Sequence, residues 1–413
     1  MKISKHLRLP EVGFQSVTST ERAALSDAWA AVPPRPHVAT SSVLERWRWV
    51  IFPALLFLGT RIALMGFSQI GLTLSPKLNW SFDPREFLIR FPFLDGLCRW
   101  DCWHFGRIAR TGYTEARWTN FFPLFPLLTR LTHDVTGMPI NLALLVVANV
   151  ASFASFLIVF RIFTRLADES AARWALIAWV AFPFAFFQAT GYPESLMTLC
   201  TALAILLALR GNHLSAGIVL GCGVLARHLT LFAGAALLVA QLRQRGINPR
   251  RLLLNPAILG LVIPWLFLAG YCLYQYRTFG NPLAFAAARD QPPWGPMAWW
   301  GIAQLLATHI RNDQVDAMYS YIPFALIPTV GAFVLLRKRE WLELAAFGVV
   351  FVTMIWAIGV WGMGRYMASC WPAFLPLGVW LAKRPAWQGP VIACLALFQG
   401  LFFFLFSHMF AIL

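Results

Sequence analysis

Long apolar runs separated by short polar segments dominate this chain of 413 residues. About 20 consecutive apolar residues are needed for a helix to cross the hydrocarbon core of a bilayer. The runs therefore predict an all-α fold, a polytopic transmembrane helical bundle of about 10–11 spans. The predicted spans are 49–74, 138–160, 174–191, 194–209, 214–226, 228–242, 252–276, 317–336, 344–361, 366–382 and 389–411. The two short runs on either side of Arg227 indicate a broken pair of half-crossings.

The beginning of the chain departs from this pattern because it is polar and punctuated by proline. Residues 1–45 lack the apolar core of a secretory signal, so we expect a disordered cytoplasmic tail there and a transmembrane domain over 46–413. Two arginines precede the first span, and the positive-inside rule then predicts that the chain crosses outward. The segment 75–135 is therefore expected to be a structured extracytoplasmic loop. Its apolar stretch 121–131 is too short to span, and we expect an interfacial or re-entrant helix.

Composition agrees with a membrane location and narrows the function. Apolar residues make up 59% of the chain and charged residues 13%, whereas soluble domains carry about 25% charged residues. A soluble enzyme, a coiled coil and a disordered scaffold are excluded. The net charge of +16 does not indicate nucleic-acid binding, because the basic residues lie mostly between apolar runs. Only five of the 34 basic residues are Lys, and the planar Arg side chain suits lipid phosphate.

Charged residues concentrate in the first predicted loop and at three span ends. These ends are 188–194, 226–228 and 364–366. A charge at the centre of a bilayer costs about 2.5–3.5 kcal/mol, so polar groups kept at span ends favour a functional interpretation. Snorkelling arginines and capping acids are the alternative for any single position. Because the predicted topology puts all four places on one membrane face, together they indicate one site.

Within the loop, Asp101 is the strongest candidate for chemistry. In a helix that starts at about Gly96, Asp101 and His104 are three residues apart and share a face. Beside an apolar wall the pKa of Asp101 is expected to rise, and the carboxylate can then act as a general base. An ion pair between Asp101 and either Arg99 or Arg107 is the structural alternative.

Two cysteines flank Asp101 in the sequence. Cys98 and Cys102 lie four residues apart, and a disulfide between them is conceivable. The expected extracytoplasmic helix over this segment would make such a disulfide strained. Two packed thiols are the favoured interpretation, and no His or second Cys pair completes a metal site.

The motifs in this region resemble those of a known family. Arg99-Trp-Asp-Cys-Trp-His-Phe-Gly-Arg-Ile-Ala-Arg-Thr-Gly-Tyr113 and Phe121-Phe-Pro-Leu-Phe-Pro126 resemble the signatures of PIG-V-type mannosyltransferases, which belong to the C-type superfamily of polytopic glycosyltransferases. Weaker matches are 191–195, 226–228, 279–285 and 364–366, and the resemblance covers roughly residues 45 to 400. Cys102 and Trp103 depart from the eukaryotic pattern.

The resemblance implies an inverting glycosyltransferase that takes a hexose, mannose in the best-known relatives, from a polyprenyl-phosphate donor. By analogy Asp101 is the general base that deprotonates an acceptor hydroxyl. Arg227 and Arg365, with Arg99 behind them, are the expected ligands of the leaving phosphate. The other expected substrate-binding residues are Asp95, His104, Tyr113, Glu115, Tyr192, Glu194, His228 and Tyr366.

Two of these expectations have alternatives. Asp95 either helps to bind the acceptor or caps the loop helix, and the cap is slightly preferred. Asp95, Asp101 and Glu115 are conceivable ligands of Mg or Mn, but the sequence has no tight DxD motif, so we expect no metal or other cofactor.

The acceptor is a lipid, a glycan or a protein, and neither it nor the sugar is fixed by the sequence. Membrane lipids are expected partners and nucleic acid is not. Arg-rich, Lys-poor composition favours a bacterial protein, hence the bacterial cytoplasmic (inner) membrane with the active site on the extracytoplasmic face. One alternative is a flippase or transporter of a lipid-linked sugar. Inverted repeats would favour it, but the sequence shows none. The other alternative is a non-catalytic lipid-binding subunit.

Overall fold

The computed structural model describes residues 43–78, 89–246, 255–289, 321–358, 362–410 and 412. Within these residues every regular element is an α-helix or a 3-10 helix. This confirms the all-α prediction. Most of the predicted tail, residues 1–45, lies outside the described residues.

The described chain consists of successive helical elements. The α-helices are α2 (Val43–Leu74), α3 (Pro92–Asp95), α4 (Asp101–Thr111), α5 (Leu124–Thr136), α6 (Ile140–Leu166), α7 (Glu169–Ala181), α8 (Glu194–Leu209), α9 (His213–Ala226), α10 (Gly234–Arg245), α12 (Leu259–Phe279), α13 (Ala284–Arg289), α15 (Ile322–Leu335), α16 (Leu342–Ile358), α17 (Met363–Ser369), α18 (Leu375–Ala382) and α19 (Pro385–Ser407). The 3-10 helices are η2 (Ala116–Asn120), η3 (Ala185–Gln188), η4 (His228–Ala233), η5 (Pro256–Ile258), η7 (Arg339–Trp341) and η8 (Trp371–Phe374).

Five helical stretches among the described residues are long and apolar enough to cross a membrane. They are Trp49–Leu74, Ile140–Leu166, Pro256–Phe279, Arg339–Ala357 and Pro385–Ser407. The outer surface of α2 is apolar: Leu55, Ile62 and Leu74 are all more than half exposed. Such a surface requires a lipid environment. The protein is an integral membrane protein.

Several predicted spans are broken where the sequence contains proline or a charge. The predicted span 174–191 ends early, because α7 stops at Ala181 and Phe182 precedes Pro183 with an extended backbone. The predicted span 366–382 is divided into α17, η8 and α18 around Pro372, which lacks a backbone N–H. The break predicted at Arg227 is confirmed, since this residue is extended (φ −161°, ψ 126°) between α9 and η4.

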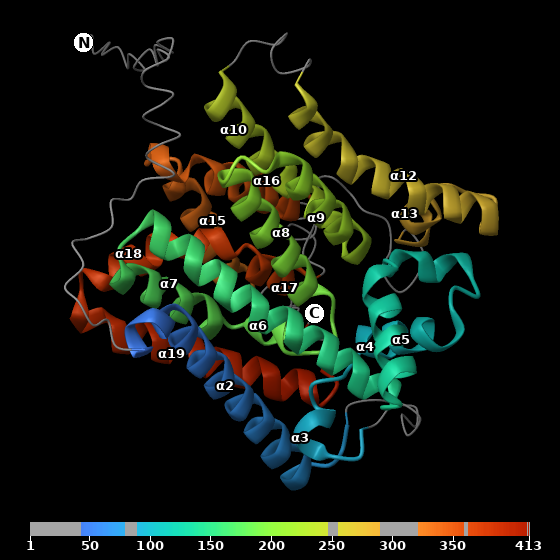
Figure 1. The fold of residues 1–413 in the computed structure, drawn as a ribbon. Helices are drawn as coiled ribbons and strands as arrows, with labels where there is room; N and C mark the ends of the chain where they lie inside the picture. Colours follow the sequence, from blue (N-terminus) through green and yellow to red (C-terminus); the bar gives the residue numbers. More distant parts are fainter. Residues whose placement is uncertain are drawn as a thin grey trace, which may run out of the picture.

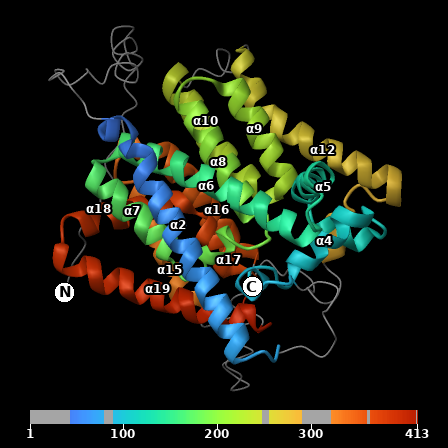
Figure 2. The same ribbon diagram turned by 60° about the horizontal axis from the view of Figure 1, so that its bottom comes forward.

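The helices α6, α7, α8 and α9 form the centre of the bundle, with α18 against α7 and α12 against α9 (Figure 1). The backbones of α9 and α12 approach closely at Gly217, whose added Cβ atom would lie 2.4 Å from the carbonyl oxygen of Gly260. Small residues permit such contacts between membrane helices. Turning the molecule shows α2 and α19 along one side and α4 and α5 at one end of the bundle (Figure 2).

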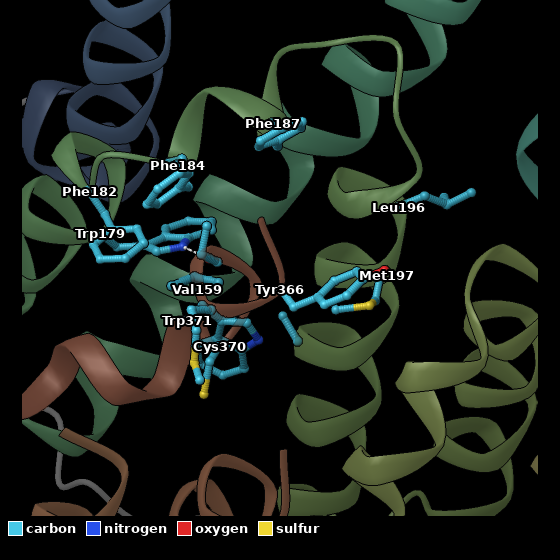
Figure 3. Close-up of a cluster of buried hydrophobic side chains, with 14 of the residues drawn as sticks. Val159, Trp179, Phe182, Phe184, Phe187, Leu196, Met197, Tyr366, Cys370 and Trp371 are labelled. Atoms are coloured by element: carbon cyan, nitrogen blue, oxygen red, sulfur yellow. Dashed lines mark hydrogen bonds between the residues drawn. The ribbon is translucent and has the colours of Figure 1, made fainter. Parts of the chain in front are cut away.

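An aromatic core fixes α17, the short helix that carries Arg365. Trp179 of α7 donates a hydrogen bond from Nε1 to the carbonyl oxygen of Ala368 at 2.7 Å. Trp179, Phe184, Trp371 and Tyr366 belong to the same buried cluster (Figure 3). Because core side chains in such clusters pack at crystal-like density, α17 has a fixed position relative to α7 and α8.

Candidate functional site

The helical structure is interrupted immediately before Asp101. The helix α3 ends at Asp95 and α4 begins at Asp101, so the helix predicted to start at about Gly96 is wrong. Trp100 between them has φ 54° and ψ −117°, a conformation that side chains other than Gly rarely adopt. Asp101 thereby becomes the first residue of α4, where the helix dipole favours a negative charge.

The break also brings the two cysteines together. Cys98 and Cys102 form a disulfide with their Cα atoms 5.3 Å apart, and both residues are buried. The preference for two packed thiols is therefore wrong. The expected helix through Cys98 is also absent, because residues 96–100 lie between α3 and α4.

Asp101 forms an ion pair with Arg365 rather than with Arg99 or Arg107. Its Oδ2 accepts a hydrogen bond from Arg365 Nη1 at 2.6 Å. The backbone N–H of Asp101 donates to the hydroxyl oxygen of Tyr192 at 3.1 Å. That hydroxyl in turn donates to the carbonyl oxygen of Arg99 at 3.2 Å. Asp101 is thus held through both its backbone and its carboxylate.

A buried acid connects Arg365 with the second arginine of the site. Glu194, the first residue of α8, is fully buried. Its Oε1 lies 3.0 Å from Arg227 Nη1 and 3.6 Å from Arg365 Nε. Arg227 Nη2 also donates to the Tyr366 hydroxyl at 2.7 Å. The four charged groups, Asp101, Glu194, Arg227 and Arg365, are formally neutral together and come from four different parts of the chain.

The electrostatics of Asp101 differ from the prediction. Burial alone would raise the pKa of its carboxyl, but the adjacent Arg365, with His104 and Arg227, lowers the pKa below its ordinary value. The carboxylate is therefore ionised at neutral pH. Burial lowers the pKa of His104, and Arg107 and Arg117 act in the same direction, against the opposite effect of Asp101. The His104 ring is accordingly neutral at pH 7.

A pocket opens beside these charges. Its lining residues are Asp101, Phe105, Asn120, Phe121, Phe122, Ala226, Arg227, His228, Arg365 and Tyr366. Five of the twelve predicted site residues therefore line it: Asp101, Arg227, His228, Arg365 and Tyr366. Tyr192 and Glu194 contact these residues from the buried side. Phe105, Asn120, Phe121 and Phe122 were not predicted as site residues, although two of them begin the Phe-Phe-Pro motif.

The histidines sit among aromatic rings at the edge of the charged cluster. The His104 ring lies 4.9 Å from Trp118 and 5.1 Å from Phe121 between centroids. The His228 ring lies 5.3 Å from Phe122. Both rings therefore pack against aromatic side chains beside the pocket.

Four of the predicted site residues do not line the pocket and make other contacts. Asp95 and Arg99 form a buried ion pair, and Arg99 also donates to the carbonyl oxygens of Asp95 and Ser407. Glu115 pairs with Arg117 at 2.9 Å on the exposed surface. Tyr113 donates to the carbonyl oxygen of Phe121 and packs near Tyr274. The preferred interpretation of Asp95 as a helix cap is wrong, because neither α3 nor α4 has a side-chain cap and Asp95 Oδ1 instead accepts a hydrogen bond from the Ile89 backbone N–H at 2.7 Å. A role of Asp95 in acceptor binding stays a prediction.

Metal ligands do not gather in the described part of the chain. No group of three or more His, Cys, Asp or Glu side chains there has the arrangement of a metal site. The alternative set of Asp95, Asp101 and Glu115 is not assembled, because each of these acids is paired with an arginine. Transfer without a metal stays a prediction.

Comparison with known proteins gives one family. Residues 85–323, more than half of the chain, match the family described as mannosyltransferase (PIG-V). The crystal structure of the Archaeoglobus fulgidus oligosaccharyltransferase in complex with Zn and sulfate is similar at 13% sequence identity and a TM-score of 0.45. The alignment covers 88% of this chain and 53% of that one, so the chain spans about half the length of that protein. No curated protein matches the chain.

Proposed function

We propose that this chain, which belongs to the PIG-V mannosyltransferase family, transfers a hexose from a polyprenyl-phosphate donor to an acceptor hydroxyl at the extracytoplasmic membrane face. Mannose is the first candidate for the sugar because the family transfers it. One observation carries the proposal: a pocket in which the carboxylate of Asp101 meets the guanidinium groups of Arg365 and Arg227. A base and two phosphate-binding cations are the groups that this reaction requires.

The proposed step displaces charge from the base to the leaving group. The acceptor hydroxyl loses its proton to Asp101 as its oxygen attacks the anomeric carbon. The bond between that carbon and the phosphate oxygen breaks, and the electron pair leaves with the polyprenyl phosphate. The phosphate changes from a diester with one negative charge to a monoester with two, while Asp101 becomes neutral. Attack opposite the leaving group inverts the anomeric carbon.

Arg365 is suited to stabilise the negative charge that moves to the leaving phosphate. In the resting site it is paired with Asp101, whose negative charge disappears as the proton arrives. The same guanidinium has a second carboxylate, Glu194, 3.6 Å from its Nε. We propose that Arg365 and Arg227 bind the phosphate through their planar forks while Glu194 holds both side chains in place.

The proposed membrane face is supported by the disulfide next to Asp101. Disulfides persist outside the cytoplasm, in the bacterial periplasm among other compartments, and are rare inside it. Arg46 and Arg48, which precede the apolar stretch Trp49–Leu74 of α2, agree with the same orientation. We therefore place the reaction on the outer side of a bacterial cytoplasmic membrane, with a lipid, glycan or protein as acceptor.

The test is transfer of labelled mannose from polyprenyl-phosphate mannose by the purified protein in lipid. Replacement of Asp101 with Asn keeps the shape but removes the base, and we expect turnover to fall by about 100-fold to 10,000-fold. Asp134→Asn, the same change on the exposed surface of α5, is the matched control and should leave turnover unchanged. Addition of a chelator tests the prediction that no metal is needed.

Full turnover by the Asp101→Asn variant would remove Asp101 from the role of base. Absence of transfer from a panel of hexose donors, with tight donor binding retained, would instead favour a flippase or a lipid-binding subunit.

A further inference from the structure

The segment 96–100, between α3 and α4, has an unfavourable backbone conformation at Trp100, the residue directly before Asp101. Trp100 has φ 54° and ψ −117°. Such conformations of residues other than Gly cost about 1–3 kcal/mol and persist only where the surrounding structure imposes them. The groups that impose this conformation at Trp100 therefore also determine the orientation of the Asp101 side chain.

Two sets of hydrogen bonds hold the segment from the buried side. The Arg99 guanidinium donates to the carbonyl oxygens of Ser407 at 2.8 Å and of Cys98 at 3.1 Å. The Tyr192 hydroxyl bridges the Arg99 carbonyl oxygen and the Asp101 backbone N–H. These contacts anchor the residues on either side of Trp100, but none of them crosses the segment covalently.

The disulfide supplies that covalent link. Cys98 and Cys102 lie on opposite sides of Trp100 and Asp101, so their bond closes the bend that contains both residues. It also rests against the turn before α8: a Cβ atom added to Gly191 would lie 2.4 Å from Cys102 Sγ. Gly191 donates its backbone N–H to the Leu97 carbonyl oxygen at 3.1 Å. The turn that carries Tyr192 and Glu194 thus packs directly on the disulfide.

We propose that the Cys98–Cys102 disulfide is a positioning element for catalysis, which keeps the bend at Trp100 closed so that the Asp101 carboxylate faces Arg365 in the pocket. The proposal rests on the proposed function of Asp101 as the base. It assigns no contact with substrate to either sulfur, since both cysteines are fully buried. The proposed donor phosphate ligands, Arg227 and Arg365, lie on other elements, before η4 and in α17.

The test is the Cys98→Ser/Cys102→Ser double variant of the full chain, assayed in lipid with polyprenyl-phosphate mannose. We expect kcat to fall by about 100-fold, the loss typical of a reacting group displaced by about 1 Å. The donor KM should change by less than about twofold, since ground-state binding is retained. The acid limb of the pH–rate profile should also move to higher pH, because Asp101 loses its close contact with Arg365. Cys272→Ser/Cys394→Ser removes two unpaired sulfurs and is the matched control.

A second variant keeps the proposal testable if the first does not fold. Gly191→Ala retains both cysteines but places a methyl group against Cys102 Sγ. It should lower kcat with little change in donor KM. Wild-type kcat in both variants would overturn the proposal, as would equal losses of donor binding and turnover, which would assign the disulfide to general stability. If Asp101→Asn keeps full turnover, the proposed function fails irrespective of the disulfide.

Discussion

Asp101 and Arg365 are 264 residues apart in the chain, yet Oδ2 of the acid accepts a 2.6 Å hydrogen bond from Nη1 of the arginine. The pair joins the first residue of α4 to α17, and both residues line the pocket. Its existence explains why the carboxyl is a stronger acid than its burial would suggest. We expect the same pair to influence how activity and stability depend on pH.

Replacement of Arg365 with Gln should raise the pKa of Asp101. In the wild type the pKa is lowered, so the carboxylate is ionised above the ordinary value of about 3.9, and activity should show no loss from Asp101 between pH 5 and 8. Without the cation, burial dominates and the acid limb of kcat/KM should move to higher pH. Arg227→Gln should move it less, since Arg227 acts on Asp101 more weakly than Arg365 does. Identical pH profiles for the wild type and Arg365→Gln would contradict this.

The same shift predicts the effect of acid on stability. A carboxyl whose pKa is lower in the folded than in the unfolded state stabilises the fold above its unfolded pKa. That contribution is lost as the pH falls through the folded pKa. We expect the midpoint of thermal unfolding in detergent to fall less below pH 4 in Asp101→Asn than in the wild type. Equal acid sensitivity of both proteins would argue against the pair.

Replacement of Arg227 with Lys keeps the charge but removes the planar fork and the contact with the Tyr366 hydroxyl. Hydrogen bonds to charged groups contribute about 1.5–3 kcal/mol, so the donor KM should rise by about 10-fold to 100-fold. Steady-state kinetics over a range of donor concentrations measures it. Arg117→Lys, in an exposed ion pair, is the control. An unchanged KM would make Arg227 structural.

Replacement of Glu194 with Gln should chiefly affect folding. Loss of this buried acid leaves two arginines without their shared carboxylate. Breaking a buried pair costs about 3–5 kcal/mol. A lowered midpoint of thermal unfolding in detergent is the expected result, and Glu115→Gln, on the surface, should not show it. Wild-type stability of the Glu194 variant would indicate that the arginines find other partners.

Arg99 provides a contrast between structure and chemistry. Its guanidinium is buried and engaged by Asp95 and by backbone carbonyl oxygens of Cys98 and Ser407. Arg99→Gln should therefore reduce the yield and thermal stability of the protein while the donor KM of the folded fraction stays within about twofold of the wild type, as expected for a residue that makes no ground-state contact with the donor. A large rise in donor KM would return Arg99 to the phosphate-binding residues.

The sequence was informative where local chemistry decides structure. The bounds of α8 and α9 and the break at Arg227 follow the apolar pattern closely, because long apolar helices and charged interruptions are local properties. The prolines at 183 and 372 indicate breaks, but the length of the apolar runs around them favours longer spans. The partner of Asp101 was not predictable, since no periodicity links residues so distant, and the direction of the Asp101 pKa shift was missed for that reason.

The disulfide shows a second reason why the site could not be fully predicted from the sequence. Cys98 and Cys102 have the spacing of one helical turn, and only the interruption at Trp100 brings their side chains together. A single residue with positive φ is set by its tertiary contacts rather than by its type. Asn120, which lines the pocket from the end of η2, was missed because an isolated amide carries no sequence pattern.

The separation of Asp101 from Arg365 along the chain also means that the two residues are synthesised at different times. Ribosomes add about 5–20 residues per second, so about 13–50 s pass between synthesis of the acid and synthesis of its partner. Glu194 and Arg227, close in sequence, can meet early. While most of the bundle inserts, the Asp101 carboxylate is therefore without Arg365 and has to be hydrated. The cluster of four charged groups is complete only when α17, one of the last helices, is synthesised.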